Sequence, residues 1–159
     1  MTVHATRRTF DLSAAVKAGL LAGLVFMAME MILVATVGGG SPWGPPRMIG
    51  AIALGADVLP PPASFDLGVF VVAMLIHFVL AVVLAVVFAF VAARLDLART
   101  TFILAGALFG LVVYFVSFYL MTAVFPWFAM ARGLITLLSH LVFGAVLAWS
   151  YLPRARRPV

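Results

Sequence analysis

One carboxyl group and two imidazoles lie within otherwise apolar stretches of the sequence: Glu30, His77 and His140. A carboxylate and two imidazoles can bind a metal ion, ligate a haem iron or carry protons. Because each of these groups is costly in hydrocarbon, we expect all three to face the interior of the folded protein. The hydroxyl groups that the sequence offers them as hydrogen-bonding neighbours belong to Ser117, Ser139, Tyr114 and Tyr119.

Four interpretations of this set follow from its chemistry. The first is a structural polar cluster, in which Glu30, His77 and His140 hydrogen-bond one another or the backbone. The second is a b-type haem ligated by the two histidines, with Arg47 and Arg132 near the outer surface to meet the propionates. The third is a metal ion bound by two histidines and a carboxylate. The fourth is a proton relay or small-cation site, and we favour the first because buried polar groups need partners but need not do chemistry.

The composition places these residues in a membrane. Of the 159 residues, 66% are hydrophobic and 9% charged, and the mean hydropathy is +1.26. Soluble proteins have roughly 45–50% apolar and about 25% charged residues. Four apolar stretches, at residues 14–37, 67–93, 101–125 and 134–152, are each near the roughly 20 residues that span a bilayer. Because only helices satisfy their own backbone in lipid, the sequence predicts an all-α, four-transmembrane-helix bundle as a single membrane domain over residues 1–159.

Lysine and arginine are distributed unequally between the two sides of these stretches. Arg47 and Arg132 lie on one side. Since cytoplasmic connections carry the excess of positive charge, the opposite side is predicted to be cytoplasmic, with both termini there. The cations on that side are Arg7, Arg8, Lys17, Arg94, Arg99, Arg154, Arg156 and Arg157.

Charge and cysteine content exclude several classes of function. The net charge of +5 is scattered over short ends without a basic stripe, so we expect anionic lipid and no nucleic acid as a partner. The absence of cysteine removes disulfides and thiolate catalysis. A cleaved signal peptide over residues 1–40 is an alternative reading of the N-terminus, but its apolar run exceeds the usual 7–15 or so residues and contains Glu30.

The longest connection, residues 38–66, is rich in proline and glycine and is predicted on the outer side. Its breakers exclude a regular spanning helix. Residues 48–54 are apolar enough to form a short helix in the membrane interface, entered through Pro45 and Pro46 as N-terminal prolines. Tryptophans near the ends of the stretches predict an aromatic belt, formed by Trp43, Trp127 and Trp149.

The two halves of the chain share a pattern of small, polar and aromatic residues. Glycines four residues apart recur in the first and third stretches, and their small-xxx-small spacing lets helix backbones approach closely. This alignment predicts a two-plus-two tandem repeat about an axis along the membrane normal. The paired residues are Gly19 with Gly106, Gly23 with Gly110, Glu30 with Ser117, Pro42 with Pro126, Trp43 with Trp127, Arg47 with Arg132, and His77 with His140.

Five short motifs are spread over most of the chain: Pro45-Pro46-Arg47, His77-Phe78, Leu104-Ala105-Gly106-Ala107-Leu108, Pro126-Trp127 and His140-Leu141-Val142-Phe143-Gly144. These motifs resemble those of the YagU family of small bacterial inner-membrane proteins. The resemblance implies a compact four-helix unit in the inner (plasma) membrane, with a histidine in each even-numbered helix and no settled biochemical activity. It makes Arg47, His77, Pro126, Trp127 and His140 the positions to test.

From these features we expect a small accessory or interaction subunit, and no enzyme, because the four stretches leave no room for a soluble catalytic domain. Its expected partners are the lipid bilayer and either a homo-oligomer or a larger membrane complex. A bis-histidine haem redox subunit and a small proton or cation transporter are the alternatives. No stretch has a proline in its middle, so the discontinuous helices typical of transporters are not predicted.

Overall fold

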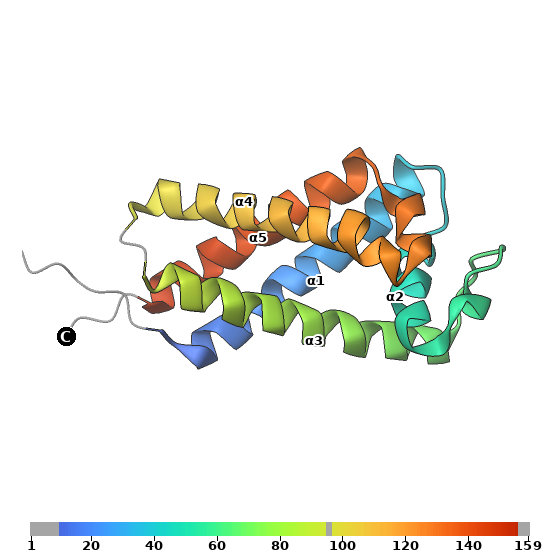
Figure 1. Cartoon of the computed structure of the whole chain (residues 1–159), viewed down its shortest axis with the longest axis horizontal. Coiled ribbons are helices and arrows are strands. Elements are labelled where there is room, and N and C mark those ends of the chain that lie inside the picture. Colours follow the sequence, from blue (N-terminus) through green and yellow to red (C-terminus); the bar gives the residue numbers. More distant parts are fainter. Residues whose placement is uncertain (1–9, 95–96, 156–159) are drawn as a thin grey trace, which may run out of the picture.

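The apolar stretches fold into helices of the expected length (Figure 1). In the computed structural model, which describes residues 10–94 and 97–155 and only the backbone of 153–155, the helices are α1 (Leu12–Thr36), α3 (Leu67–Ala92), α4 (Arg99–Phe115) and α5 (Leu134–Ala155). With the continuation of α4 to Ala123, four helices are long and apolar enough to cross a membrane. The predicted all-α architecture with four helices of spanning length is confirmed over the described residues, where every regular element is a helix.

Aspartate caps fix where α1 and α3 begin. The Asp11 side chain accepts a hydrogen bond from the Ala14 amide at 2.9 Å, and that of Asp66 accepts one from the Val69 amide at 2.9 Å. Each cap satisfies a backbone N–H that has no partner within its helix. Both helix starts are therefore set by a local sequence signal.

The third stretch, which forms α4, ends irregularly. After α4 come a π-helical turn (Val116–Leu120), a 3₁₀ turn (Met121–Ala123) and the segment η4 (Pro126–Ala131). A π-turn leaves carbonyls without their usual partners, and Arg132 Nε donates to the Phe118 carbonyl at 2.6 Å. Arg132 also donates to the Thr122 hydroxyl at 3.1 Å. Arg132 thus closes this end of the helix.

The connection over residues 38–66, termed the outer connection after its predicted side, contains the predicted short helix. It is α2 (Gly44–Leu54), which has prolines in its first turn and is followed by the 3₁₀ turn η1 (Ala56–Val58). Its start lies four residues before the predicted one, because the two prolines form part of the helix rather than preceding it. α2 packs against α3, where a Cβ on Gly50 would come within 3.0 Å of Val69. Its position in a membrane interface stays a prediction.

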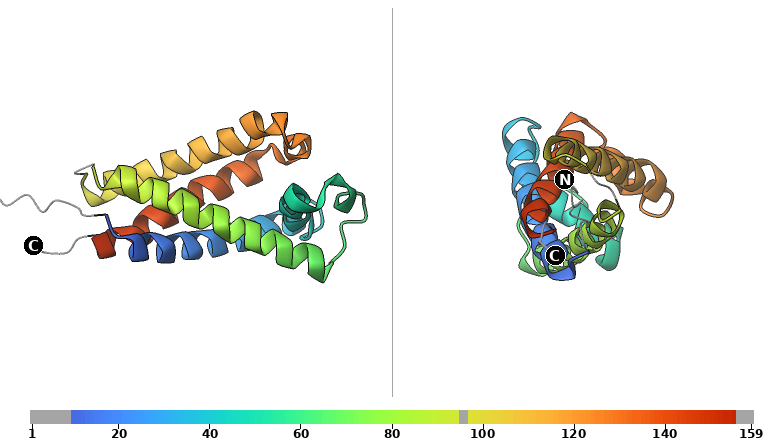
Figure 2. Two further views of the ribbon diagram at one scale, coloured as in Figure 1. Left: turned by 60° about the horizontal axis from the view of Figure 1, so that its bottom comes forward. Right: turned by 90° about the vertical axis from the view of Figure 1, so that its left-hand side faces the viewer.

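The four long helices pack in the order α3, α1, α5, α4 (Figures 1 and 2). α1 contacts both α3 and α5, and α4 contacts α5. α3 and α4 approach each other mainly through Phe88, whose ring lies 5.6 Å from that of Phe102 and 5.4 Å from that of Phe109. The seam between α3 and α4 is therefore the weakest of the bundle.

The closest helix contacts follow the predicted repeat. A Cβ on Gly19 would meet Ala81 and Ala85, and one on Gly106 would meet Gly144 and Ala148, which occupy the corresponding positions. In the same way a Cβ on Gly23 would meet the His77 side chain, and one on Gly110 would overlap the His140 carbonyl. Each half thus packs its first helix on its second through the same positions.

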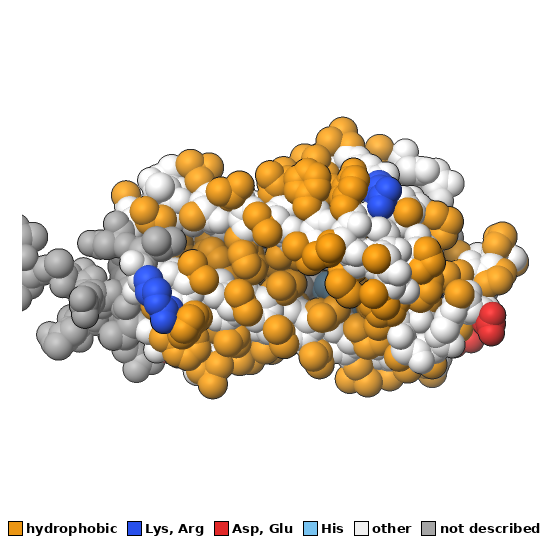
Figure 3. All heavy atoms as spheres, in the orientation of Figure 1, with side chains coloured by type: hydrophobic (Ala, Val, Ile, Leu, Met, Phe, Trp, Pro, Cys, Tyr) orange, Lys and Arg blue, Asp and Glu red, His pale blue; other side chains and the backbone are white. Residues whose placement is uncertain are grey.

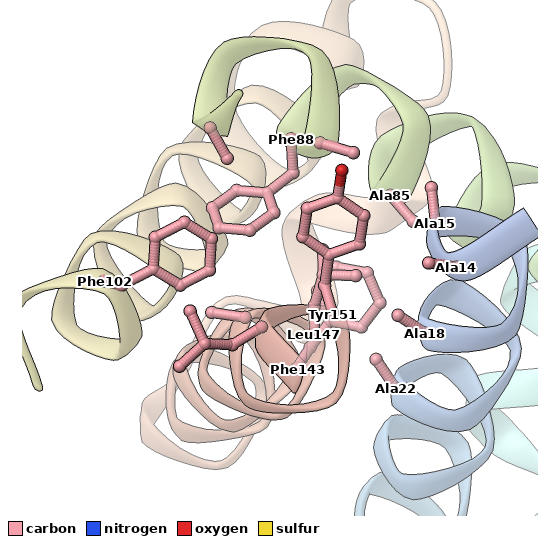
Figure 4. Packing of buried hydrophobic residues seen from close by; sticks show 14 of the residues in the cluster. Ala14, Ala15, Ala18, Ala22, Ala85, Phe88, Phe102, Phe143, Leu147 and Tyr151 are labelled. Atoms are coloured by element: carbon pink, nitrogen blue, oxygen red, sulfur yellow. The ribbon is translucent and has the colours of Figure 1, made fainter. Parts of the chain in front are cut away.

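One apolar core joins all four helices at the end where α1 begins and α5 ends (Figure 4). Small alanines of α1 lie against Tyr151 and Leu147 of α5, while Phe88 and Phe102 close the other side. The Tyr151 hydroxyl accepts a hydrogen bond from the Asp11 amide at 3.3 Å. Among the cations used to predict orientation, Arg7, Arg8, Arg156 and Arg157 lie outside the described residues, as does the side chain of Arg154.

Candidate functional site

Glu30 joins α1 to α5 in the half of the bundle that carries α2. Its side chain is buried, with an exposed fraction of 5%, and Oε1 accepts a hydrogen bond from the Thr136 hydroxyl at 2.6 Å. The second carboxyl oxygen, Oε2, is buried and has no hydrogen-bond partner among the described residues. Only one of the two carboxyl oxygens of Glu30 therefore has a hydrogen bond, which is costly for a buried polar group and calls for an explanation.

His140 shares Thr136 with Glu30. Its Nδ1 lies 2.8 Å from the Thr136 carbonyl, one turn earlier on α5. Three aromatic rings meet the imidazole edge to face, with centroids 4.7 Å away for Phe26, 5.4 Å for Phe118 and 5.7 Å for Tyr114. The side chain is held by one hydrogen bond and an aromatic enclosure.

His77 is held in a similar way from α3. Its Nε2 lies 2.9 Å from the Gly23 carbonyl of α1, at the close contact between the two helices. The Phe26 ring stacks on the imidazole at 5.6 Å and so contacts both histidines. Histidine atoms are visible at the bottom of a hollow on the face that α3 and α4 form (Figure 3), although both side chains are more than nine-tenths buried.

The carbonyl partners fix the tautomers of both histidines. A carbonyl oxygen only accepts hydrogen bonds, so Nε2 of His77 and Nδ1 of His140 carry the hydrogens that they donate. In a neutral imidazole the other nitrogen is then an acceptor. Each histidine consequently presents a lone pair at the nitrogen that does not contact the backbone.

The arrangement does not fit a haem held between His77 and His140. A bis-histidine haem needs the macrocycle between the two imidazoles. Here the Phe26 ring packs on both, at 5.6 Å and 4.7 Å. Both imidazoles contact the Phe26 side chain of α1, so no gap for a haem lies between them in this conformation. The haem hypothesis stays a prediction, and it requires the Phe26 side chain to move out of this position.

Arg47 and Arg132 are engaged by the backbone rather than free for propionates. Arg47 donates to the Ser64 carbonyl at 2.9 Å and to the Val58 carbonyl at 2.6 Å, which ties the outer connection together. Arg132 closes the end of the third span, and its guanidinium lies 4.4 Å from the Tyr119 ring centroid. Both arginines therefore shape loops in this structure.

The third interpretation, a metal site, finds no support in the geometry. Within residues 10–94 and 97–155, no three His, Cys, Asp or Glu side chains group closely enough to hold a metal ion. Glu30, His77 and His140 are linked instead through Thr136 and Phe26. These intermediaries hold the three side chains apart.

The hydroxyl residues predicted to lie near Glu30, His77 and His140 differ in their burial and in their contacts. Ser139 is fully buried but donates to the Ile135 carbonyl of its own helix at 3.0 Å. Tyr114 is buried and contacts His140 through its ring. Ser117 lies half-buried in the π-helical turn, and none of the described hydrogen bonds joins it to Glu30.

Thr136 and Phe26 are the residues that sequence reasoning missed. Each lies one helical turn before a residue that was identified: Thr136 precedes His140 by four positions, and Phe26 precedes Glu30 by four. Residues at this spacing share a helix face. That spacing indicates a shared helix face for both residues, but it does not predict the contacts that they make with other helices.

In comparisons with known proteins, no family model, curated protein or solved structure matches the chain. The resemblance to the YagU family therefore stays a prediction. The site has to be interpreted from its own geometry.

Proposed function

We propose that this chain is a multi-pass protein of the bacterial inner membrane, with both termini in the cytoplasm, that acts as a small accessory or interaction subunit. Four apolar helices support the membrane location, and Figure 3 shows hydrophobic side chains over the middle of one face with charged groups towards its ends. Side chains so distributed match the layers of a bilayer.

The proposed role rests on the hydrogen-bond partners of the polar side chains. His77, His140, Arg47, Arg132 and Trp127 all donate to main-chain carbonyls of the chain itself. In particular, Trp127 Nε1 reaches the Met48 carbonyl at 3.0 Å and joins the second outer connection to α2. Side chains that bond to the main chain in this way stabilise the protein's own fold, and a subunit that binds a partner requires such a stable fold.

An apolar groove on the outward side of α3 is the surface that we assign to the partner. Its volume is about 530 Å³, and it runs between two ridges of α3 with Leu20 of α1 at its edge. Ridges four residues apart with a groove between them accept the side chains of another helix. The residues that line it are Leu20, Phe70, Val71, Met74, Leu75, Phe78, Val79, Val82 and Val83. We assign the groove to a transmembrane helix of another subunit.

Matched tryptophan substitutions test the assignment. Val79 in the groove and Leu108 on the outward side of α4 are exposed to nearly the same extent, 62% and 60%. The protein, tagged at native expression level and extracted in a mild detergent, should migrate on native gels well above its 17.0 kDa monomer. Val79→Trp should return it to the monomer, whereas Leu108→Trp should leave the complex intact.

Two results would contradict the proposal. A wild-type protein that runs as a monomer after mild extraction and after cross-linking in the membrane has no stable partner, and the groove then holds only lipid chains. Equal loss of the complex in both variants would place the contact elsewhere than on α3.

A further inference from the structure

Oε2 of Glu30 is the one buried side-chain nitrogen or oxygen atom without a hydrogen-bond partner among the described residues. The carboxyl group lies inside the bundle, with 5% of its residue's surface exposed. Its single described hydrogen bond comes from a neutral hydroxyl, that of Thr136. An ionised carboxylate in such surroundings would lack most of the donors that normally stabilise it.

The charged and titratable groups on the neighbouring elements are committed elsewhere. On α5, His140 donates through Nδ1 to the Thr136 carbonyl, and Arg132 just before α5 donates to Phe118 and Thr122. On α3, His77 donates to Gly23. In the outer connection, Arg47 binds Ser64 and Val58. Tyr114 and Tyr119, from the third span, contact His140 and Arg132 respectively.

From this geometry we propose that Glu30 is a proton-binding site: Oε2 carries a hydrogen, and the side chain is a neutral carboxylic acid in the folded protein. The hydrogen on Oε2 removes the charge that the site does not balance. Oε1 remains the acceptor of the Thr136 hydroxyl, so the observed bond at 2.6 Å is retained. The site lies on the contact between α1 and α5, the helices that join the two halves of the chain.

The proton on Glu30 cannot pass to His140 through Thr136. The Thr136 hydroxyl serves Glu30 and its carbonyl serves His140, and a carbonyl oxygen accepts but does not donate. The hydrogen-bond path therefore ends at this residue. Glu30 therefore binds its proton without a relay through Thr136.

The sequence makes this proton directly observable. Glu30 is the only glutamate in the chain, and there is no glutamine. Cell-free synthesis with glutamate ¹³C-labelled at Cδ therefore labels one carboxyl group. We would reconstitute the labelled protein in phosphatidylcholine bilayers and record its infrared spectrum, in which a neutral acid and a carboxylate absorb at separate frequencies.

We expect the isotope-shifted band of a neutral acid at pH 7. The band should be absent from unlabelled protein, and it should move to higher frequency in Thr136→Val because that variant removes the hydrogen bond to Oε1. Ser139→Ala, which removes a buried hydroxyl of α5 not bonded to Glu30, should leave the band unmoved.

Carboxylate bands at pH 7 in the labelled wild-type protein would overturn the proposal. So would a neutral-acid band that Thr136→Val does not move, because the proton would then belong to a conformation other than this one. Both measurements use the wild-type chain or a near-isosteric variant. The test therefore does not depend on whether a Glu30 variant folds.

Discussion

At the scale of single residues, His77 and His140 show how much the residue type predicts about the contacts of a side chain. The sequence pairs His77 with His140 in the two halves of the chain, and the structure brings both against Phe26. The ring between them could not be predicted, because facing depends on how each helix is rotated about its axis. Carbonyl partners at 2.9 Å and 2.8 Å then make both imidazoles donors within the scaffold.

An absorbance spectrum tests the haem hypothesis at this scale. We expect mildly solubilised protein from a haem-replete host to be colourless, with no Soret band in the reduced-minus-oxidised spectrum, because Phe26 packs on both imidazoles. The His77→Ala and His140→Ala variants should give the same flat spectrum. Soret and α bands that vanish in both variants would instead establish a bis-histidine cytochrome, and Phe26 would have to move aside.

At the scale of the elements, the spans and the outer helix were predictable and the contacts between them only partly so. Span length and the aspartate caps at Asp11 and Asp66 are local signals, so the observed spans begin and end within two residues of the predicted ones. The π-helical turn at Val116–Leu120 has no such signal, since it depends on Arg132 reaching the freed Phe118 carbonyl. Thr136 was missed because its partner Glu30 lies on another helix.

Glycine substitutions test the close packing of α4 on α5. A Cβ on Gly110 would overlap the His140 carbonyl, a backbone atom that cannot turn aside. We expect Gly110→Ala to lower the unfolding free energy by about 1–3 kcal/mol, the usual cost of overpacking. Gly44→Ala is the control, because a Cβ there has no heavy atom within 4 Å.

Reversible unfolding of the variants in mixed detergent micelles measures the difference. Gly23→Ala should fall between the other two, since its Cβ would meet the Ala81 and His77 side chains at 2.9 Å and 3.3 Å rather than a carbonyl. Equal stabilities for Gly110→Ala and Gly44→Ala would mean that α4 and α5 are farther apart in the membrane than in this structure.

At the scale of the whole molecule, the contacts between the two halves match the predicted repeat only in part. Two related halves would make two equivalent contacts with each other, α1 with α5 and α4 with α3. The first is extensive, whereas the second depends mainly on Phe88. The sequence predicts the repeat through Gly19, Gly23, Gly106 and Gly110, but it does not predict this asymmetry, because the asymmetry arises from how the halves dock.

The orientation of the molecule is testable because the chain contains no cysteine. Single cysteines can be placed at Ser41, in the outer connection, and at Arg99, where α4 begins. Eight of the ten cations lie on the side of Arg99, so we expect a membrane-impermeant maleimide added to intact spheroplasts to label Ser41→Cys and not Arg99→Cys. Lysed membranes should expose both sites, which controls for reactivity. Labelling of Arg99→Cys alone in intact spheroplasts would invert the topology and place Glu30 in the cytoplasmic half of the bundle, so that its proton would exchange with the cell interior.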